Sequence, residues 1–377
     1  MMKTALIAPE IFDGKLLHRE VALLLQNDIV EGLVSNKAVP DGYDRQIYET
    51  GVILPGFVDL QVNGGGGVMF NDDTSVTGLK TIAAAHASTG TRSFLPTLIT
   101  DTADKTLAAI AAVEDAIVQD IPGIVGIHLE GPHIAIAKKG AHDPALVRRM
   151  EAADEAVLRD AARRLPHVMV TVAPESVTPD QIRRLSAGGV IVALGHTACS
   201  FDAAQAAFAA GASCVTHLFN AMQPLGSREP GLVGAMLGTS GIAAGLIADN
   251  VHVHAVSMQI ALNTSDSIFL VTDAMATLGS DIGQFQLNGR TVSRKDGRLT
   301  LADGTLAGAD LDLPQAISVL IDHMGVPRAR AYAMATSLPA QCLGTRAGWG
   351  FFTPGRPANA IRLSDEHTYL GPVPAVA

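Results

Sequence analysis

The sequence predicts an α/β fold, a (β/α)8 TIM-like barrel joined to a small β-sandwich that both ends of the chain build. From Val52 onward, apolar runs that end in polar residues alternate with Ala-rich segments of helical spacing. Residues 1–53 instead alternate in the manner of short strands. Hydrophobic residues make up 48% of the chain and aromatic residues only 4%, which favours the Ala, Val, Leu and Ile core of a helix-covered parallel sheet.

The barrel is predicted from eight apolar runs that have the length and the polar ends of parallel strands. In chain order these runs are GFVDLQV, RSFLPTL, IVGIHLE, HVMVTVAPE, VIVALGHT, SCVTHLF, AAGLIAD and SIFLVTDA. The segments between them have helical spacing, and several begin at a Ser, Thr or Asp cap and end at Gly, as in TADKTLAAIAAVEDAIVQD, TPDQIRRLSAGG and SFDAAQAAFAAG. Eight such units in succession predict a closed barrel.

The two chain ends predict the second domain. After the last barrel strand come a less regular stretch, GQFQLNGRTVSRKDGRLTLADGTLAG, and two helices, DLPQAISVLIDHMG and ARAYAMATSLPAQCLG. The tail AGWGFFTPGRPANAIRLS again has the pattern of strands, and the simplest arrangement returns it to the N-terminal strands. We therefore expect a β-sandwich from residues 1–53 and 346–377 and a barrel from residues 54–345.

Charge and cysteine content exclude several classes of function. The chain has 27 basic and 37 acidic residues, a net charge of −10, and no run of Lys or Arg that could follow a nucleic-acid backbone. Its cysteines, Cys199, Cys214 and Cys342, are widely spaced, which is typical of a reducing cytoplasm. Neither a signal peptide nor a membrane-spanning stretch is found. We expect a cytoplasmic protein that binds neither nucleic acid nor membrane.

Polar residues at the strand ends mark the expected catalytic mouth, which lies at the carboxyl ends of barrel strands. Glu130, His196 and His217 follow the third, fifth and sixth strands, and one carboxylate with two imidazoles suits a divalent metal. Zinc is the commonest occupant of such a site, and iron, cobalt and manganese are alternatives. Asp273, after the eighth strand, is placed to take a proton from water and hand it to a leaving group.

Each of these residues also has an ordinary interpretation. A lone histidine after a strand is more often a hydrogen-bonded loop residue, and Asp273 in TDAMATLG has the sequence context of a helix cap. The presence of all four residues at strand ends favours the metal site.

The first strand ends in Gln61 and Asn63, at the spacing where many metal hydrolases carry two histidines. The fourth strand ends in VAPE, which offers Glu175 and no lysine. The ligands of a second metal are therefore missing, and we expect one ion per chain. Gln61 is expected to hydrogen-bond a water at that ion, and Asn63 to order the glycine turn.

An anion site is suggested by GSREPG and ADNVHVH. Arg228 precedes a Pro-Gly turn and an apolar helical segment, and Asp249 and His252 follow the seventh strand. A surface charge is the ordinary interpretation of a loop arginine. His142, in KKGAHDP, is within reach of a substrate carbonyl or hydroxyl, although a solvated loop histidine is the default.

At these positions the sequence closely resembles the N-acetylglucosamine-6-phosphate deacetylases of the amidohydrolase superfamily. The matching motifs cover nearly the whole chain in the family's order: PGFVDLQVNGGGGVMFND, HLEGPHIAIAKKGAHDP, LGHTACSFDAAQAAFAAGASCVTHLFNAM, REPGLVGAML, ADNVHV, LVTDAM and GTLAGA. The resemblance implies hydrolysis of the acetamide of N-acetyl-D-glucosamine 6-phosphate to D-glucosamine 6-phosphate and acetate, in amino-sugar catabolism or recycling. It also implies that Glu130, His196 and His217 are metal ligands and that Asp273 is the catalytic acid and base.

Substrate contacts follow from the same resemblance. The residues that match sugar contacts are Ala141, His142, Asn220, Ala221, Leu306, Ala307 and Gly308. Arg228 and His252, with Asp249 in the same motif as His252, match the phosphate-binding positions. Some of these contacts come from the neighbouring subunit in the family, which implies a homodimer.

The chain departs from the family at three places near the expected site, one of which is DAMATLGS, where a proline is common after the aspartate. His133 stands where relatives usually carry a larger apolar or aromatic residue, and we interpret it as a spectator and not as an alternative ligand. Ala309 and Asp310 stand where the family often has a serine, beside the expected sugar contacts.

Three alternatives to this function stay open. N-acetylgalactosamine 6-phosphate would use the same chemistry on an epimeric sugar. A catalytically silent barrel that serves as a binding protein would have lost ligands, whereas all four residues are present here. A cyclic amidase or nucleobase deaminase of the same superfamily would be expected to have two histidines after the first strand.

Overall fold

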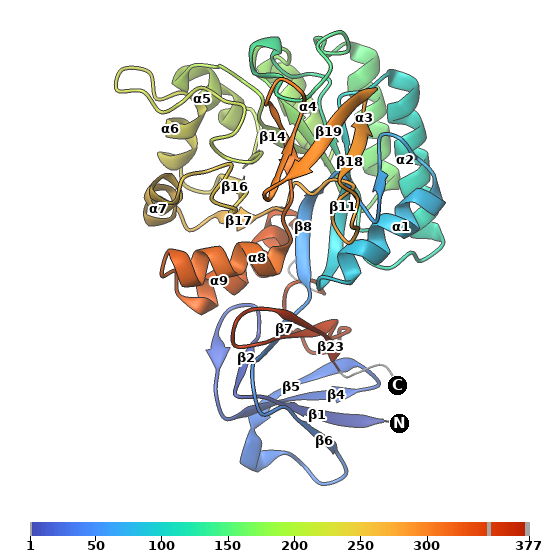
Figure 1. Ribbon diagram of the computed structural model, residues 1–377, viewed down its shortest axis with the longest axis vertical. Coiled ribbons are helices and arrows are strands. Elements are labelled where there is room, and N and C mark those ends of the chain that lie inside the picture. Colours follow the sequence, from blue (N-terminus) through green and yellow to red (C-terminus); the bar gives the residue numbers. More distant parts are fainter. Residues whose placement is uncertain (1, 345–347, 374–377) are drawn as a thin grey trace. The chain divides into compact units, whose positions relative to one another are not determined.

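The computed structural model describes residues 2–344 and 348–373, which form two compact units (Figure 1). One unit holds the described residues of Met1–Asp59, Ala87–Ser93 and Leu313–Ala377, and the other holds Leu60–His86 and Phe94–Asp312. The expected domain boundary at residues 345 and 346 lies outside the described residues.

An eight-stranded parallel sheet forms the predicted barrel, in the order β17-β16-β15-β14-β13-β12-β11-β8. An isolated parallel bridge between Val62 and Ala274 links the region after the last strand to the first strand. All eight predicted strands are confirmed: β8 Phe57–Val62, β11 Thr91–Ile99, β12 Ile127–Glu130, β13 Val168–Val172, β14 Ile191–Leu194, β15 Cys214–Val215, β16 Ala243–Leu246 and β17 Ile268–Leu270.

Helices lie between the barrel strands where the Ala-rich segments predict them. Thr102, Thr178 and Ser200 cap three of these helices, since each side chain accepts a hydrogen bond from a backbone N–H of the first turn. The helices are α1 Val76–Ala87, α2 Ala103–Val118, α3 Ala152–Arg164, α4 Pro179–Ala187, α5 Phe201–Ala209, α6 Gly231–Leu237 and α7 Ala255–Thr264, with a 3-10 turn at Ile136–Lys138. A two-stranded ribbon follows β8, formed by β9 Gly64–Gly65 and β10 Val68–Met69.

The stretch that we expected to be irregular is an antiparallel four-stranded sheet. Its strands, in spatial order, are β18 Gln284–Leu287, β19 Arg290–Lys295, β20 Arg298–Thr300 and β21 Leu306–Ala309. Asn288-Gly289 and Asp296-Gly297 connect the first three strands, and all four of these residues have positive φ. Two-residue turns of this kind match the twist of a β-hairpin, and Asn-Gly and Asp-Gly are the pairs that adopt them most easily.

The other unit contains the predicted β-sandwich of both chain ends. Its sheets have the orders β5-β4-β1-β6 and β23-β22-β7-β2-β3, and the C-terminal strand β22 pairs antiparallel with β7. Leu6 and Leu23 of one sheet share a buried apolar cluster with Ile11, Ile53 and Ala360 of the other. The strands are β1 Lys3–Ile7, β2 Glu10–Phe12, β3 Leu17–His18, β4 Val21–Gln26, β5 Ile29–Ser35, β6 Asp44–Ile47, β7 Val52–Pro55, β22 Ala360–Leu363 and β23 Tyr369–Val373.

The same unit also holds the helices that follow the barrel strands in the sequence. They are α8 Leu313–Ser318, α9 Arg328–Ala335 and α10 Ser337–Cys342, with a π-helical turn at Val319–His323. A 3-10 turn at Asn36–Ala38 lies between β5 and β6 of this unit. No helix within residues 2–344 and 348–373 has the length and apolarity needed to cross a membrane. All three cysteines are free thiols.

Candidate active site

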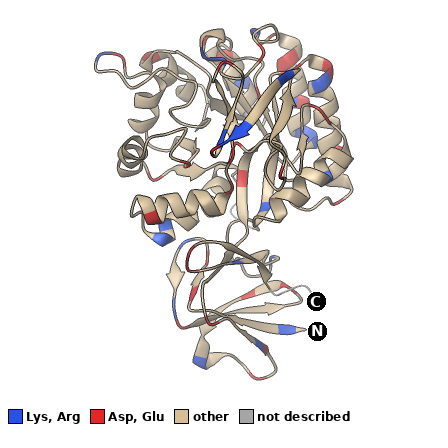
Figure 2. Cartoon of the chain, in the orientation of Figure 1, with Lys and Arg blue, Asp and Glu red and all other residues tan. Residues whose placement is uncertain are grey.

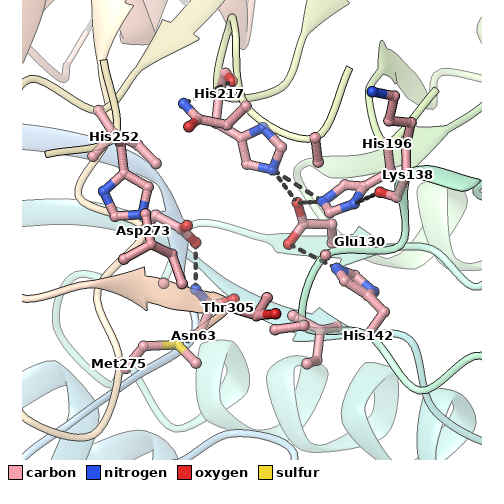
Figure 3. A pocket seen from close by; sticks show the side chains of 18 of the residues that line it. Asn63, Glu130, Lys138, His142, His196, His217, His252, Asp273, Met275 and Thr305 are labelled. Atoms are coloured by element: carbon pink, nitrogen blue, oxygen red, sulfur yellow. Dashed lines mark hydrogen bonds and ion pairs between the residues drawn. The ribbon is translucent and has the colours of Figure 1, made fainter. Parts of the chain in front are cut away.

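A cavity of about 380 Å³ lies where the carboxyl ends of the barrel strands meet (Figure 3). Most of the residues that the sequence assigned to the site line it: Glu130, Ala141, His142, His196, His217, Asn220, Ala221, His252, Asp273, Leu306 and Gly308. They come from many separate stretches of chain, and the barrel brings them together because its parallel strands all end at one mouth.

Glu130, His196 and His217 form a tight triangle of possible metal ligands. Glu130 Oε1 lies 3.1 Å from His196 Nε2 and 3.0 Å from His217 Nε2, and the two Nε2 atoms are 3.0 Å apart. Although burial alone would raise the pKa of Glu130, hydrogen bonds from the two histidines hold that pKa well below its usual value. The carboxylate is therefore charged and directed at both imidazoles.

The orientation of His196 suits a metal ligand. Its Nδ1 lies 2.8 Å from the carbonyl oxygen of Lys138, in the 3-10 turn that follows β12. An Nδ1–H that donates to this carbonyl leaves the Nε2 lone pair directed at the triangle, which is the arrangement common among histidines that bind metals. The donor set of one carboxylate and two imidazoles fits zinc and similar ions.

His142 extends this cluster from the loop after β12. Glu130, His142 and His196 each have one possible ligand atom within 4.8 Å of those of the other two. His142 Nδ1 is 2.7 Å from Thr100 Oγ1, and its Nε2 is 3.9 Å from Glu130 Oε2. Burial, together with the nearby charge of His196, lowers the pKa of His142 to about 3, so its imidazole is neutral at physiological pH.

Asp273 lies on the other side of the cavity and is held by two amide side chains. Asn63 Nδ2 donates to Asp273 Oδ1 at 2.6 Å, and Gln61 Nε2 donates to the same oxygen at 3.1 Å. Gln61 Nε2 also lies 3.1 Å from Glu130 Oε1, so a single amide links the two carboxylates. Burial, reinforced by the charge of Glu130, raises the pKa of Asp273 to about 6, which is suitable for a group that exchanges protons near neutral pH.

Three of these residues have a left-handed backbone. The φ angles of His196, His217 and Asp273 are 48°, 28° and 50°. Residues other than glycine seldom adopt this conformation, and strained backbone of this kind tends to cluster at active sites.

His252 and Asp249 form a close pair beside Asp273. His252 Nδ1 lies 2.6 Å from Asp249 Oδ2, while Asp249 Oδ1 accepts hydrogen bonds from the backbone N–H groups of Val251 and His252 at 2.8 Å each. His252 lines the cavity, and Asp249 supports it from outside. The carboxylate therefore fixes the orientation of the ring.

Other predicted residues do not line the cavity. Arg228 is exposed on the loop before α6, and the side chain of Ala307 is fully buried on the opposite face of β21 from Leu306 and Gly308. His133 points away from the triangle, since its Nδ1 lies 3.2 Å from the carbonyl oxygen of Arg148. This orientation places His133 outside the candidate metal site.

Several residues that the sequence did not assign to the site line the cavity. Asn63, at the end of β8, could have been predicted from the sequence. Residues i and i+2 of a strand share a face, and Gln61 was already expected to face the site. Others are Lys138, Met275, Leu287 and Thr305. Leu287, Thr305, Leu306 and Gly308 come from the β18–β21 sheet and its loops, which therefore form one wall. Figure 2 shows basic residues on β19, of which Arg290 donates to the carbonyl oxygen of Ala141 in the His142 loop.

Comparisons with known proteins give relatives that match most of this chain. A sequence model of the amidohydrolase family matches residues 52–372. The N-acetylgalactosamine-6-phosphate deacetylase of Shewanella sp. (strain ANA-3) is 39% identical over 353 residues, which cover 93% of this chain and 89% of the relative. The N-acetylglucosamine-6-phosphate deacetylase of Haemophilus influenzae is 32% identical over 376 residues, with coverage of 99% and 98%.

Solved structures show the same architecture over nearly the full length. The crystal structure of N-acetylglucosamine-6-phosphate deacetylase from Pasteurella multocida has a TM-score of 0.94 at 31% identity, covering 99% of this chain and 98% of that one. An alanine variant of the Mycobacterium smegmatis deacetylase, in complex with N-acetyl-D-glucosamine-6-phosphate, has a TM-score of 0.90 at 30% identity, covering 98% and 97%.

Proposed function

This chain belongs to the amidohydrolase family and is a hydrolase, and we propose that it removes the acetyl group of N-acetyl-D-glucosamine 6-phosphate to give D-glucosamine 6-phosphate and acetate. The observation that carries the proposal is the meeting of the Glu130, His196 and His217 triangle with Asp273 in one cavity. Amide hydrolysis needs an activated water and an acid for the departing amine, and this arrangement provides for both.

One divalent ion, for which zinc is our first choice, would be held by Glu130, His196 and His217. When bound, it would polarise the acetyl carbonyl and lower the pKa of a water molecule. Asp273 would take a proton from that water at Oδ2, since both amide donors occupy Oδ1. The oxygen of the water would bond to the acetyl carbon, and Asp273 would then give its proton to the amine nitrogen as the C–N bond breaks, so that acetate and the free amine are released. Neutral His142 would hydrogen-bond the acetyl oxygen.

The rest of the cavity would bind the sugar phosphate. Asn220, Ala221, Leu306 and Gly308 line the cavity wall and would contact the sugar. His252, oriented by Asp249, would bind the phosphate. The charge on phosphate calls for a cation, and Arg228 of this chain is exposed outside the cavity.

We propose that Arg228 reaches the phosphate site of a second copy in a homodimer. Leu225, in the same loop, is 53% exposed, and Val256 and Ile260 of α7 are 60% and 52% exposed. In such a dimer a partner chain would cover these exposed apolar side chains.

Acetate release tests the proposal. The purified protein, loaded with one equivalent of zinc, should release acetate from N-acetyl-D-glucosamine 6-phosphate. One free amine should form for each acetate that is released. Asp273→Asn should lower kcat by about 10³-fold or more with zinc still bound, as expected for loss of an essential proton-transfer group. Asp281→Asn, which alters an exposed aspartate outside the cavity, is the control. No acetate from the zinc-loaded wild type would reject the proposal.

N-acetylgalactosamine 6-phosphate is the second candidate substrate. The relatives at 39% and 35% identity, from Shewanella sp. (strain ANA-3) and Escherichia coli O157:H7, are both N-acetylgalactosamine-6-phosphate deacetylases. The two sugars differ at one hydroxyl group, so the comparison that separates the candidates is kcat/KM for both substrates with one enzyme preparation. A higher value for the galacto sugar would replace our first choice.

A further inference from the structure

We propose that Asn63 is a positioning residue for Asp273, and that it selects Oδ2 as the oxygen that carries the proton. This inference rests on the proposed function, because it concerns the acid of the same reaction. It differs from our expectation that Asn63 orders the glycine turn.

The hydrogen bonds of Asp273 distinguish its two oxygens. Oδ1 accepts from Asn63 Nδ2 at 2.6 Å and from Gln61 Nε2 at 3.1 Å, whereas no described residue donates to Oδ2. An oxygen that already accepts two amide N–H bonds is a poor site for a proton. The free oxygen is therefore the one that can take a proton from water and deliver it to the amine.

The side chain of Asn63 is not needed for the glycine turn. Its backbone N–H donates to the carbonyl oxygen of Ala274 at 2.9 Å, and its own carbonyl accepts from Phe70 N–H at 2.9 Å. These bonds remain with any side chain. The close packing belongs to Gly64, where an added Cβ would lie 2.4 Å from the carbonyl oxygen of Val68. The role that remains for the side chain of Asn63 is its hydrogen bond to Asp273.

Backbone contacts make this arrangement stiff. Asp273 N–H donates to the carbonyl oxygen of Gln61 at 3.1 Å, and Gly64 N–H donates to that of Ala274 at 3.1 Å. The end of β8 and the segment after β17 are thus joined on both sides of the Asn63 and Asp273 pair. Asn63 is only 1% exposed, so its amide is largely shielded from bulk water.

The chemistry of an amide suits Asn63 to this positioning role. An amide cannot be deprotonated in this range of pH, so it donates to the carboxylate whatever the protonation of its neighbours. Asn63 can therefore hold Asp273 in place both before and after the proton moves to Oδ2.

The test compares Asn63→Ala with wild type in the zinc-loaded enzyme, using N-acetyl-D-glucosamine 6-phosphate. We expect kcat to fall by about 10- to 100-fold, the usual effect of removing a group that orients a catalytic residue, with KM changed less than about threefold. Asn71→Ala is the matched control, because buried Asn71 binds the backbone of Ile99 and not Asp273. It should keep kcat within about threefold of wild type.

Binding to an inactive background separates positioning from direct substrate contact. The dissociation constant of the same sugar phosphate, measured by calorimetry for Asp273→Asn and for the double variant with Asn63→Ala, should differ by less than about twofold. A tenfold weaker binding by the double variant would make Asn63 a substrate contact and overturn the inference. Wild-type kcat in Asn63→Ala would also overturn it.

A second variant covers the case in which Asn63→Ala does not fold. Asn63→Asp has the same shape and replaces the amide donor by an oxygen, so its kcat should fall at least as far as that of the alanine variant. Normal turnover by this variant would reject the inference. A wild-type enzyme that releases no acetate would instead reject the proposed function, so the two failures are distinguishable.

Discussion

His196 Nε2 lies 3.0 Å from His217 Nε2, and both atoms lie within 3.1 Å of Glu130 Oε1. A cation at this point would bind the folded chain and not the unfolded one, so it should stabilise the fold. At a free zinc concentration of 1,000 times Kd the stabilisation is about 4 kcal/mol. Scanning calorimetry with and without a chelator should show a melting temperature that rises with zinc.

The stoichiometry of this site is a separate expectation. Gln61 and Asn63 donate hydrogen bonds to carboxylates and offer no imidazole, so we expect one zinc per chain by elemental analysis. His217→Gln should lower that content, while His323→Gln, which changes an exposed histidine, should not. Two zinc ions per chain would contradict a mononuclear site.

The pair of Asp249 and His252 should govern substrate affinity. Asp249→Ala removes the carboxylate that lies 2.6 Å from His252 Nδ1, so the ring loses its fixed orientation. We expect KM to rise by about tenfold, with kcat changed less than about threefold, which is the pattern of lost uniform binding. Steady-state kinetics on N-acetyl-D-glucosamine 6-phosphate would measure both values. A loss confined to kcat would assign the pair to catalysis instead.

Arg228 should act across a dimer interface. Alone, Arg228→Ala and Asp273→Asn should each be weakly active or inactive. In a mixed dimer, one site would combine the intact Asp273 of the first chain with the intact Arg228 of the second. Mixing the two variants under conditions of subunit exchange should therefore restore up to about a quarter of wild-type activity, since half the dimers are mixed and each has one complete site. No recovery in a mixture shown to exchange would place Arg228 in its own site or outside it.

Acid should destabilise the barrel unit through His86. This histidine is fully buried, with Nε2 3.0 Å from the carbonyl oxygen of Gly64, and burial lowers its pKa to about 4. Between pH 6.5 and 4 the unfolded chain binds the extra proton and the folded chain does not. The stability that His86 contributes is therefore complete above pH 6.5 and is lost as the pH falls toward 4, by roughly 2 to 3 kcal/mol.

The measurement is urea unfolding at pH 7.5 and pH 5. His86→Gln, whose amide can still donate to Gly64, should lose less stability between these two pH values than wild type does. His323→Gln, at an exposed position, should behave like wild type. Equal pH dependence in wild type and His86→Gln would show that His86 does not carry this effect.

The barrel and its central cluster were predictable because one rule governs both. Strands of a parallel barrel end at the same mouth, so Glu130, His196, His217 and Asp273 could be expected near one another from their strand ends alone. The β18–β21 sheet was missed, although Asn288-Gly289 and Asp296-Gly297 are strong hairpin signals in the sequence. The polar and apolar residues of QFQL and RLT do alternate, but strands of three to six residues are too short for this alternation to predict a sheet without those turns.

Side-chain partners were less predictable than positions. Spacing placed Asn63 at the end of the first strand, but only the structure pairs it with Asp273, more than two hundred residues away in the chain. The direction of His133 likewise depends on its bond to Arg148 O, a contact that no local pattern encodes. Long-range pairing of this kind is set by tertiary packing.

The part of the cavity wall that the β18–β21 sheet and its loops form is separate in sequence from the possible metal ligands. Leu287, Thr305, Leu306 and Gly308 line the cavity, yet this stretch supplies no member of the Glu130, His196 and His217 triangle. Substitutions in this wall can change the shape of the cavity without changing the three possible metal ligands. We expect substitutions in this wall to change the preference between the two epimeric sugars while the Glu130, His196 and His217 triangle stays the same.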